Sequence, residues 1–209
     1  MRRHIATLLT TLLLAGATST ALAQDHEPTK TNLPSTTTDA GQGVSDAVLT
    51  KKLTFMLSGY EYFPSRKDLD GLASADVVTA KLRTFADDTS MRPSLRLRAV
   101  DALGYYDDEA TVAYLRALVD RPTETLPTDQ QRVGNLVRHH AIVALAKAVG
   151  PDALDDLEPF LKGDDLQLRL TAINAIGKHG GKAGHTLLEK LLKNEDNPAA
   201  LREIRKFVR

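Results

Sequence analysis

The feature that most constrains the fold is an internal repeat. Three ten-residue segments, which begin at Leu95, Val137 and Leu168, align without gaps. In each segment apolar residues stand at positions i, i+4, i+7 and i+8, the spacing of one face of an amphipathic helix. Two of these positions are alanine in every copy, at 99 and 102, 141 and 144, and 172 and 175. Because small side chains let helices approach closely, we expect the three helices to pack in equivalent ways.

The alignment continues beyond a turn into a second helix. An arginine is shared by the three segments, and nineteen residues after it stands a leucine, at Leu115, Leu157 and Leu188. Four residues further on are Val119, Leu161 and Leu192. The arginine recurs at 96, 138, 169 and 202, and the long first interval contains an insertion around residues 122–134. Helix pairs that repeat in this way indicate a solenoid, in which each pair stacks on the next.

The repeated segment also resembles a known family. The pattern Leu95-Arg96…Ala99…Ala102-Leu103-Gly104 is similar to the consensus of the HEAT-repeat family, in particular the short bacterial type known from phycobilisome lyases. The resemblance covers residues 92–209 closely and extends weakly over 45–88. It implies an all-α fold, a right-handed α-solenoid of about four HEAT-like helix pairs plus a C-terminal capping helix. We expect helices near 45–59, 73–87, 93–106, 109–120, 130–149, 152–162, 165–178, 183–194 and 198–208.

The N-terminal part of the chain reads as an export signal. Arg2 and Arg3 precede an apolar stretch at residues 5–17, and Ala21-Leu22-Ala23 fits a cleavage site. The apolar stretch is shorter than the roughly 20 residues that a membrane-spanning helix needs. We therefore predict a signal peptide at 1–23 that is cleaved after Ala23, and an exported protein that is periplasmic or secreted. Residues 24–44 are rich in Thr, Pro, Ser and Gly, which predicts a disordered linker before a repeat domain at 45–209.

Composition and motifs argue against an enzyme, a nucleic-acid binder or a metalloprotein. The chain has 27 basic and 27 acidic residues, whereas a nucleic-acid binder normally carries a basic excess. It contains no cysteine, no phosphate-binding loop and no His-Glu-x-x-His motif. His139 and His140 are helix neighbours that point about 100° apart, and His179 and His185 lack a third donor nearby. We expect no enzymatic activity, no cofactor and no metal.

The repeated arginines are expected to be structural. Acidic or amide residues precede three of them, and the resemblance to HEAT repeats implies that such pairs bond within and between repeats and fix the stacking. These expected partners are Asn135 for Arg138, Asp164 and Asp165 for Arg169, and Asp196 and Asn197 for Arg202, whereas Arg96 is grouped with them by register. Anion binding by the row Arg96, Arg138, Arg169 and Arg202 is the alternative.

Two surfaces are candidates for binding a partner. The first is an aromatic edge at turns inside the repeats, made of Tyr60, Tyr62, Phe63, Tyr105 and Tyr106. Tyrosine is frequent at binding hot spots, but the loop at 60–71 could instead cover the N-terminal end of the stack. The second is a stripe of mixed charge on the second helices, made of Arg116, Asp120, Glu158, Lys162, Glu189 and Lys193. A stripe of both signs suits protein recognition, although a solvated helix face has the same appearance.

The sequence thus predicts an exported, non-enzymatic HEAT-repeat scaffold that mediates protein–protein interaction in the periplasm or cell envelope. The identity of the protein partner and the oligomeric state stay open. We expect no nucleic-acid partner and no membrane contact once the signal is cleaved. The basic and apolar residues of the last helix, 201–209, are expected to cap the stack. The alternative, implied by the family resemblance, is a phycobilisome-lyase-like protein that handles tetrapyrroles.

Overall fold

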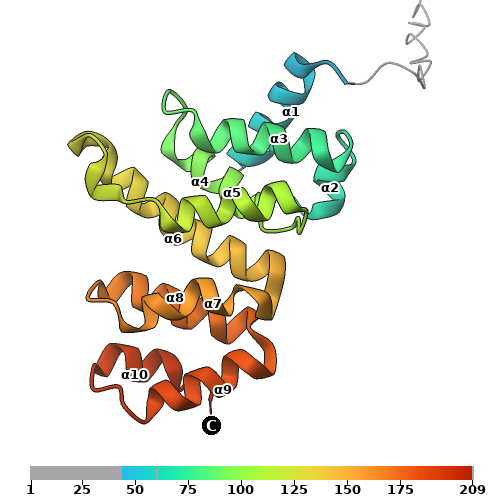
Figure 1. The fold of residues 1–209 in the computed structure, drawn as a ribbon. Coiled ribbons are helices and arrows are strands. Elements are labelled where there is room, and N and C mark those ends of the chain that lie inside the picture. Colours follow the sequence, from blue (N-terminus) through green and yellow to red (C-terminus); the bar gives the residue numbers. More distant parts are fainter. Residues whose placement is uncertain (1–43, 60, 209) are drawn as a thin grey trace, which may run out of the picture. The chain divides into compact units, whose positions relative to one another are not determined.

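Two layers of helices build the described part of the chain (Figure 1). The computed structural model describes residues 44–59 and 61–208, and within these ranges it contains helices and no strands. The predicted signal peptide lies outside the described residues, as does the predicted linker apart from Val44. The described helices all belong to one unit of the chain, residues 41–209. They form the all-α solenoid that the repeats predict.

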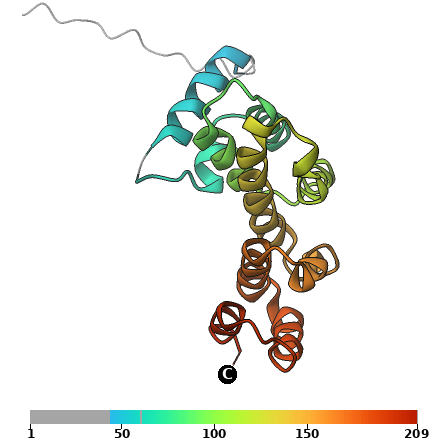
Figure 2. The same ribbon diagram turned by 90° about the vertical axis from the view of Figure 1, so that its left-hand side faces the viewer.

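The first helices of successive repeats form one layer, in which each helix packs against the next. In chain order they are α1 (Asp46–Ser58), α4 (Pro93–Leu103), α6 (Thr128–Val149), α8 (Leu166–His179) and α10 (Pro198–Ile204). The second layer contains α3 (Ala75–Asp87), α5 (Glu109–Asp120), a segment at 150–162 and α9 (Gly181–Leu192). Figure 2 shows the layers edge-on, with the orange and red second helices beside α8 and α10.

The repeated residues make the contacts between helices. The paired alanines of α4, α6 and α8 are all buried, and so are the leucines at 115, 157 and 188. Gly104 lies so close to α6 that an added Cβ would stand 2.9 Å from the Cα of Ala144. Real side chains do not tolerate such a distance from backbone atoms, so the helices approach this closely only with small residues at the contact. The predicted equivalence of the repeats is confirmed.

One expected second helix is broken. The sequence predicts a single helix over 152–162, but the structure has η2 (Gly150–Ala153), α7 (Leu154–Leu157) and η3 (Glu158–Lys162), where η denotes a 3₁₀-helix. Pro159 has no N–H to donate to the helical ladder, and its ring disfavours an uninterrupted α-helix. The chain winds more tightly around this proline, which replaces a regular helix with short turns.

Two short helices that the sequence did not predict lie in the connections. α2 (Arg66–Asp70) interrupts the loop after α1, and a capping box between Ser65 and Asp68 starts it. η1 (Thr123–Thr125) lies in the insertion between α5 and α6.

The C-terminal helix caps the stack. Ala200, Ile204 and Val208 are buried against the core. An added Cβ on Gly177 of α8 would collide with the ring of Phe207, so the glycine makes room for this ring. The apolar side of α10 and the residues after it therefore cover α8, as expected for a capping helix.

Candidate functional site

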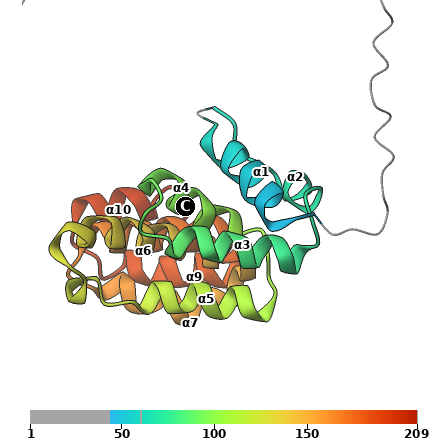
Figure 3. The same cartoon turned by 90° about the horizontal axis from the view of Figure 1, so that it is seen from above.

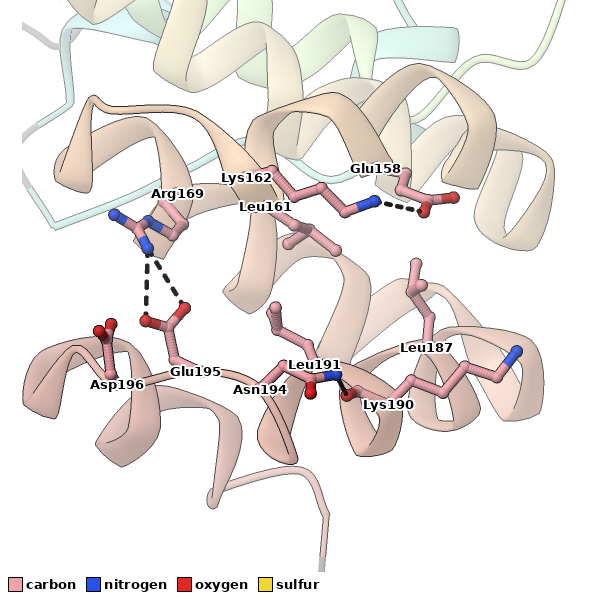
Figure 4. A pocket seen from close by; sticks show the side chains of 10 residues that line it. All are labelled: Glu158, Leu161, Lys162, Arg169, Leu187, Lys190, Leu191, Asn194, Glu195 and Asp196. Atoms are coloured by element: carbon pink, nitrogen blue, oxygen red, sulfur yellow. Dashed lines mark hydrogen bonds and ion pairs between the residues drawn. The ribbon is translucent and has the colours of Figure 1, made fainter.

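A groove lies between the two most C-terminal elements of the second layer, η3 and α9 (Figure 4). It encloses about 430 Å³. Leu161, Leu187 and Leu191 form its apolar lining, and Leu187 and Leu191 stand one turn apart on α9. The short turns around Pro159 supply the opposite wall. The groove therefore exists where the repeat pattern predicts a regular helix and the chain has none.

Charges of both signs surround the leucines. Lys162 and Glu158 form an ion pair of 3.6 Å along η3, and both side chains are exposed. Across the groove are Lys190 and Asp196. The lining as a whole carries three cations, Lys162, Arg169 and Lys190, and three carboxylates, Glu158, Glu195 and Asp196. A surface with this charge distribution and an apolar floor fits an amphipathic protein segment.

A buried ion pair closes one end of the groove. Arg169 Nη1 lies 3.3 Å from both carboxylate oxygens of Glu195. The Glu195 side chain is only 3% exposed and that of Arg169 is 19% exposed. Glu195 Oε1 also accepts the backbone N–H of Asn197, the residue that caps α10. The pair thus links α8 to the start of α10.

The equivalent arginines bind differently. Arg96 Nε donates to the carbonyl oxygen of Ala86 at 3.0 Å, and Arg138 Nε donates to that of Val119 at 2.7 Å. These acceptors lie near the C-terminal ends of α3 and α5, where helical carbonyls lack partners of their own. Arg169 Nε is buried without a hydrogen-bond partner, and the segment before α8 ends in a 3₁₀-helix instead of an α-helix.

The partners expected for these arginines are corrected by these contacts. Asn135 accepts a bond from Thr123 instead of Arg138. Asp165 accepts the N–H groups of Gln167 and Leu168, which caps α8, and Asn197 caps α10 in the same way. Short polar side chains directly before a helix satisfy its free N–H groups first. Arg202 is exposed, and none of the hydrogen bonds among the described residues involves its side chain.

In a comparison with protein families, residues 135–205 match the family model of HEAT repeats. These residues contain the first helices α6, α8 and α10, the broken segment and α9. Residues 135–205 thus contain HEAT repeats. HEAT repeats generally serve as scaffolds for protein interaction, so a protein partner is the expected ligand of this domain. A search of curated proteins finds no match to the chain.

The predicted mixed-charge stripe is only partly gathered at the groove. Glu158 and Lys162 line it, whereas Glu189 and Lys193 are exposed residues of the α9 region outside its lining. Arg116 is engaged with the next repeat, because its Nε lies 3.0 Å from Asp156 Oδ2 of α7. Asp120 is exposed at the end of α5. The residue that sequence analysis missed here is Lys190, one turn before Asn194 on the groove side of α9.

The predicted aromatic edge divides into exposed and buried members. Tyr62 is exposed, whereas Tyr106 is 2% exposed and its hydroxyl donates to Asp70 at 2.9 Å. Burial and this carboxylate raise the pKa of Tyr106 well above its usual value. Phe63 and Tyr105 pack against each other, with ring centroids 6.4 Å apart. Tyr60 lies outside the described residues. Tyr106 offers no surface to a partner, which corrects its place in an exposed edge.

Two arginines, Arg98 and Arg66, hold the loop that carries Tyr62 and Phe63. Arg98 of α4 donates to the carbonyl oxygens of Leu57, Gly59 and Tyr62. Its guanidinium also lies 5.3 Å from the centre of the Phe63 ring. Arg66 donates to the carbonyl of Tyr105 and lies 5.1 Å from the Tyr106 ring. These contacts hold the loop against α4. They agree with the second interpretation given above, in which the loop at 60–71 covers the N-terminal end of the stack.

A row of polar contacts between first helices was not predicted. His140 Nδ1 lies 2.7 Å from Asp101 Oδ1, and His139 Nδ1 lies 2.8 Å from Thr171 Oγ1. Asn174 Nδ2 donates to Glu203 Oε1 at 2.8 Å. The three contacts join α4 to α6, α6 to α8 and α8 to α10. The partners are 29 to 39 residues apart in the sequence, so only the stacking of the repeats identifies the pairs.

Two further findings concern the described residues alone. Across 44–59 and 61–208, no three His, Cys, Asp or Glu side chains gather in an arrangement that could hold a metal ion. Within the same ranges, none of the helices has the length and apolar character needed to cross a membrane.

Proposed function

We propose that this protein is an exported, non-enzymatic scaffold that binds an amphipathic helix of a partner protein in the groove between η3 and α9. The observation that carries the proposal is the leucine floor of this groove, bordered by equal numbers of cations and carboxylates. An amphipathic helix can place apolar side chains at i, i+3, i+4 and i+7 between the leucines, while its flanking charges meet the rim.

The site is suited to recognition rather than to catalysis. Its buried charges, Arg169 and Glu195, neutralise each other and join two helices. Its exposed charges, Lys162 and Lys190, stand on opposite walls. Exposed rim charges steer association and select the partner, whereas buried apolar contacts contribute most of the affinity.

Site-specific photo-crosslinking in cells of the source organism tests the groove. A photoreactive residue at Asn194, which lines the groove, should yield an adduct with one partner, and the same residue at Leu136 on α6 should not. Reversing both rim lysines, Lys162→Glu with Lys190→Glu, should abolish the adduct. The matched control reverses two exposed lysines outside the groove, Lys178→Glu with Lys182→Glu, and should retain it.

The crosslinked peptide identifies the partner and tests its chemistry. Mass spectrometry should place the crosslink in a helical segment with apolar residues at i, i+3, i+4 and i+7. An adduct that survives reversal of Lys162 and Lys190, or one that forms equally at Leu136, contradicts the groove as the docking site.

Export is tested separately. N-terminal sequencing of the protein recovered from the periplasmic or secreted fraction should begin at Gln24. A chain that begins at Met1 and stays with the cytoplasmic fraction would contradict export without touching the groove. The tetrapyrrole-handling alternative keeps only the sequence resemblance as its support, and a shift in the visible absorption of added haem or bilin would revive it.

A further inference from the structure

The outer side of α1 carries an apolar stripe. Val44 precedes this helix, and Val48 and Phe55 lie on it; Phe55 is 81% exposed and Val48 is 46% exposed. The opposite side of the same helix is fully used, because Leu49, Leu53 and Leu57 are buried in the core. Phe55 is too exposed to contribute to the core, so its exposure calls for a partner outside this domain.

Two lysines flank the stripe. With about 100° per residue, Phe55 lies about 20° from Val48 around the helix axis, Lys52 about 40° to one side and Lys51 about 60° to the other. Both lysines are exposed, and neither forms an ion pair within the described part of the chain. The stripe therefore has an apolar centre between two free positive charges.

No acidic side chain shares this surface. The residues that line the shallow hollow along α1 are Val48, Lys51, Lys52, Phe55, Met56 and Leu72. The one acid of α1, Asp46, lies about 160° from Val48 around the axis and is paired with Lys81 of α3. A ligand that complements this surface has an apolar region to cover Val48 and Phe55 and anionic groups beside it to meet the two lysines.

We propose that α1 docks on an anionic lipid surface, with Val48 and Phe55 entering the acyl region and Lys51 and Lys52 contacting lipid phosphates. Amphipathic helices bind membranes by burying an apolar face and by attracting anionic headgroups. Lysine side chains are long enough to reach the headgroups while their methylene groups stay beside the apolar residues.

The shape of the surface favours a lipid over an acidic peptide. α1 lies at the edge of the stack, where no described helix covers its outer side (Figure 3). The hollow has α1 along one side and only Leu72 beyond it, so it does not enclose Phe55. A peptide needs walls to bury its side chains, whereas a membrane surface covers a protruding side chain without them.

Basic and apolar residues also occur together at the other end of the chain. Residues 201–209 combine basic and apolar residues, but the structure places Ile204 and Phe207 against α8. Those apolar groups are no longer available to a lipid. The surface at α1 is thus distinct from the capping helix and from the groove at η3, and its test is independent of the partner protein.

The test uses the chain from Gln24 onward, since this chain retains the whole buried core of the described residues. The protein has no tryptophan, so Phe55→Trp introduces a single fluorescent reporter. Added vesicles of phosphatidylglycerol and phosphatidylcholine should shift its emission to shorter wavelength, and vesicles of phosphatidylcholine alone should not. Leu136→Trp, on the exposed side of α6, should show no shift with either vesicle.

Cosedimentation with the same anionic vesicles measures the contribution of each group. Lys51→Gln with Lys52→Gln should weaken binding about thirtyfold, which corresponds to about 1 kcal/mol for each lysine near the surface. The matched control, Lys178→Gln with Lys182→Gln, should bind as the parent does. Phe55→Ser should also weaken binding while leaving the helical circular dichroism unchanged.

Three results would overturn the proposal. They are absence of an emission shift in the Phe55→Trp variant with anionic vesicles, an equal loss of binding in the Lys178 and Lys182 control, and a shift that an acidic amphipathic peptide produces but vesicles do not. The last result would assign the same stripe to a protein partner instead.

Discussion

The junction before α6 and the junction before α8 are built from the same repeat position, yet only the second is open. At the first junction, Arg138 Nε binds the carbonyl of Val119, and its guanidinium lies 5.2 Å from the centre of the Phe160 ring. At the second, Arg169 pairs with Glu195, and its Nε has no partner. The two arginines align in the sequence, so the residue type alone does not decide the contact.

The preceding element makes the difference. α5 runs as a regular helix to Asp120 and presents a carbonyl to Arg138, whereas η3 winds tightly around Pro159 and presents none to Arg169. At the second junction, the 3₁₀-helix η3 forms one wall of the leucine-lined groove. At this repeat position Arg138 only joins two helices, whereas Arg169, which follows the broken helix, lines a candidate binding site.

The largest expected effect comes from separating the buried pair. Glu195→Ala leaves the Arg169 charge buried without a carboxylate and removes the acceptor for the N–H of Asn197. We expect the free energy of unfolding to fall by about 3 kcal/mol, as for other buried pairs that lose one partner. Urea denaturation measures this loss, and the exposed control Glu189→Ala should stay within about 0.5 kcal/mol of the parent. A loss below about 1 kcal/mol for Glu195→Ala would mean that the pair is not coupled to folding.

The closed junction should respond less strongly. Arg138→Met removes the bond to Val119 and the contact with Phe160, and we expect a loss of about 2 kcal/mol because the bond has a charged donor. Arg202→Met, at the equivalent exposed position, should cost less than about 0.5 kcal/mol. The same denaturation experiment compares the two variants. Equal losses would show that the position matters through its register and not through the contacts described above.

Acid should weaken the contact between α6 and α8. Burial lowers the pKa of His139 below its usual value of about 6.5, and the opposing attraction of Asp165 does not cancel it. The unfolded chain therefore binds this proton more readily, so stability is complete above about pH 6.5 and declines as the pH falls through the lowered pKa. Thermal unfolding between about pH 7.5 and pH 5 should show a shallower decline for His139→Gln than for the parent. A His139→Gln curve parallel to the parent would remove this histidine from the explanation.

The smallest effect is expected at the rim of the groove. Lys162→Ala breaks the exposed pair with Glu158 and should change the free energy of unfolding by less than about 0.5 kcal/mol, since both groups are solvated. The variant therefore separates stability from binding, because partner capture should weaken while the denaturation midpoint stays unchanged. A large stability loss would instead make Lys162 part of the fold.

The repeat made much of this architecture predictable. Helices with alanine pairs at fixed positions have one face that can be buried only against equivalent helices, so Ala99, Ala141 and Ala172 determined the first layer. Bounds such as 109–120 for α5 also followed from the sequence. The groove could not be predicted from the sequence, because the prediction of one helix over 152–162 neglected the destabilising effect of Pro159 on an α-helix. Lys190 was missed because only the packing of η3 against α9 brings it to the groove.

The sequence by itself determined that this chain forms paired helices, their order and the buried face of most of them, because these depend on local periodicity. Only the tertiary structure decided which surface groups meet and which stay free. Tyr106 became buried against Asp70, Phe55 stayed exposed, and Arg169 turned to Glu195 instead of a helical carbonyl. Each outcome depends on a neighbour distant in the chain or on the lack of one, and periodicity along a single helix carries no information about either.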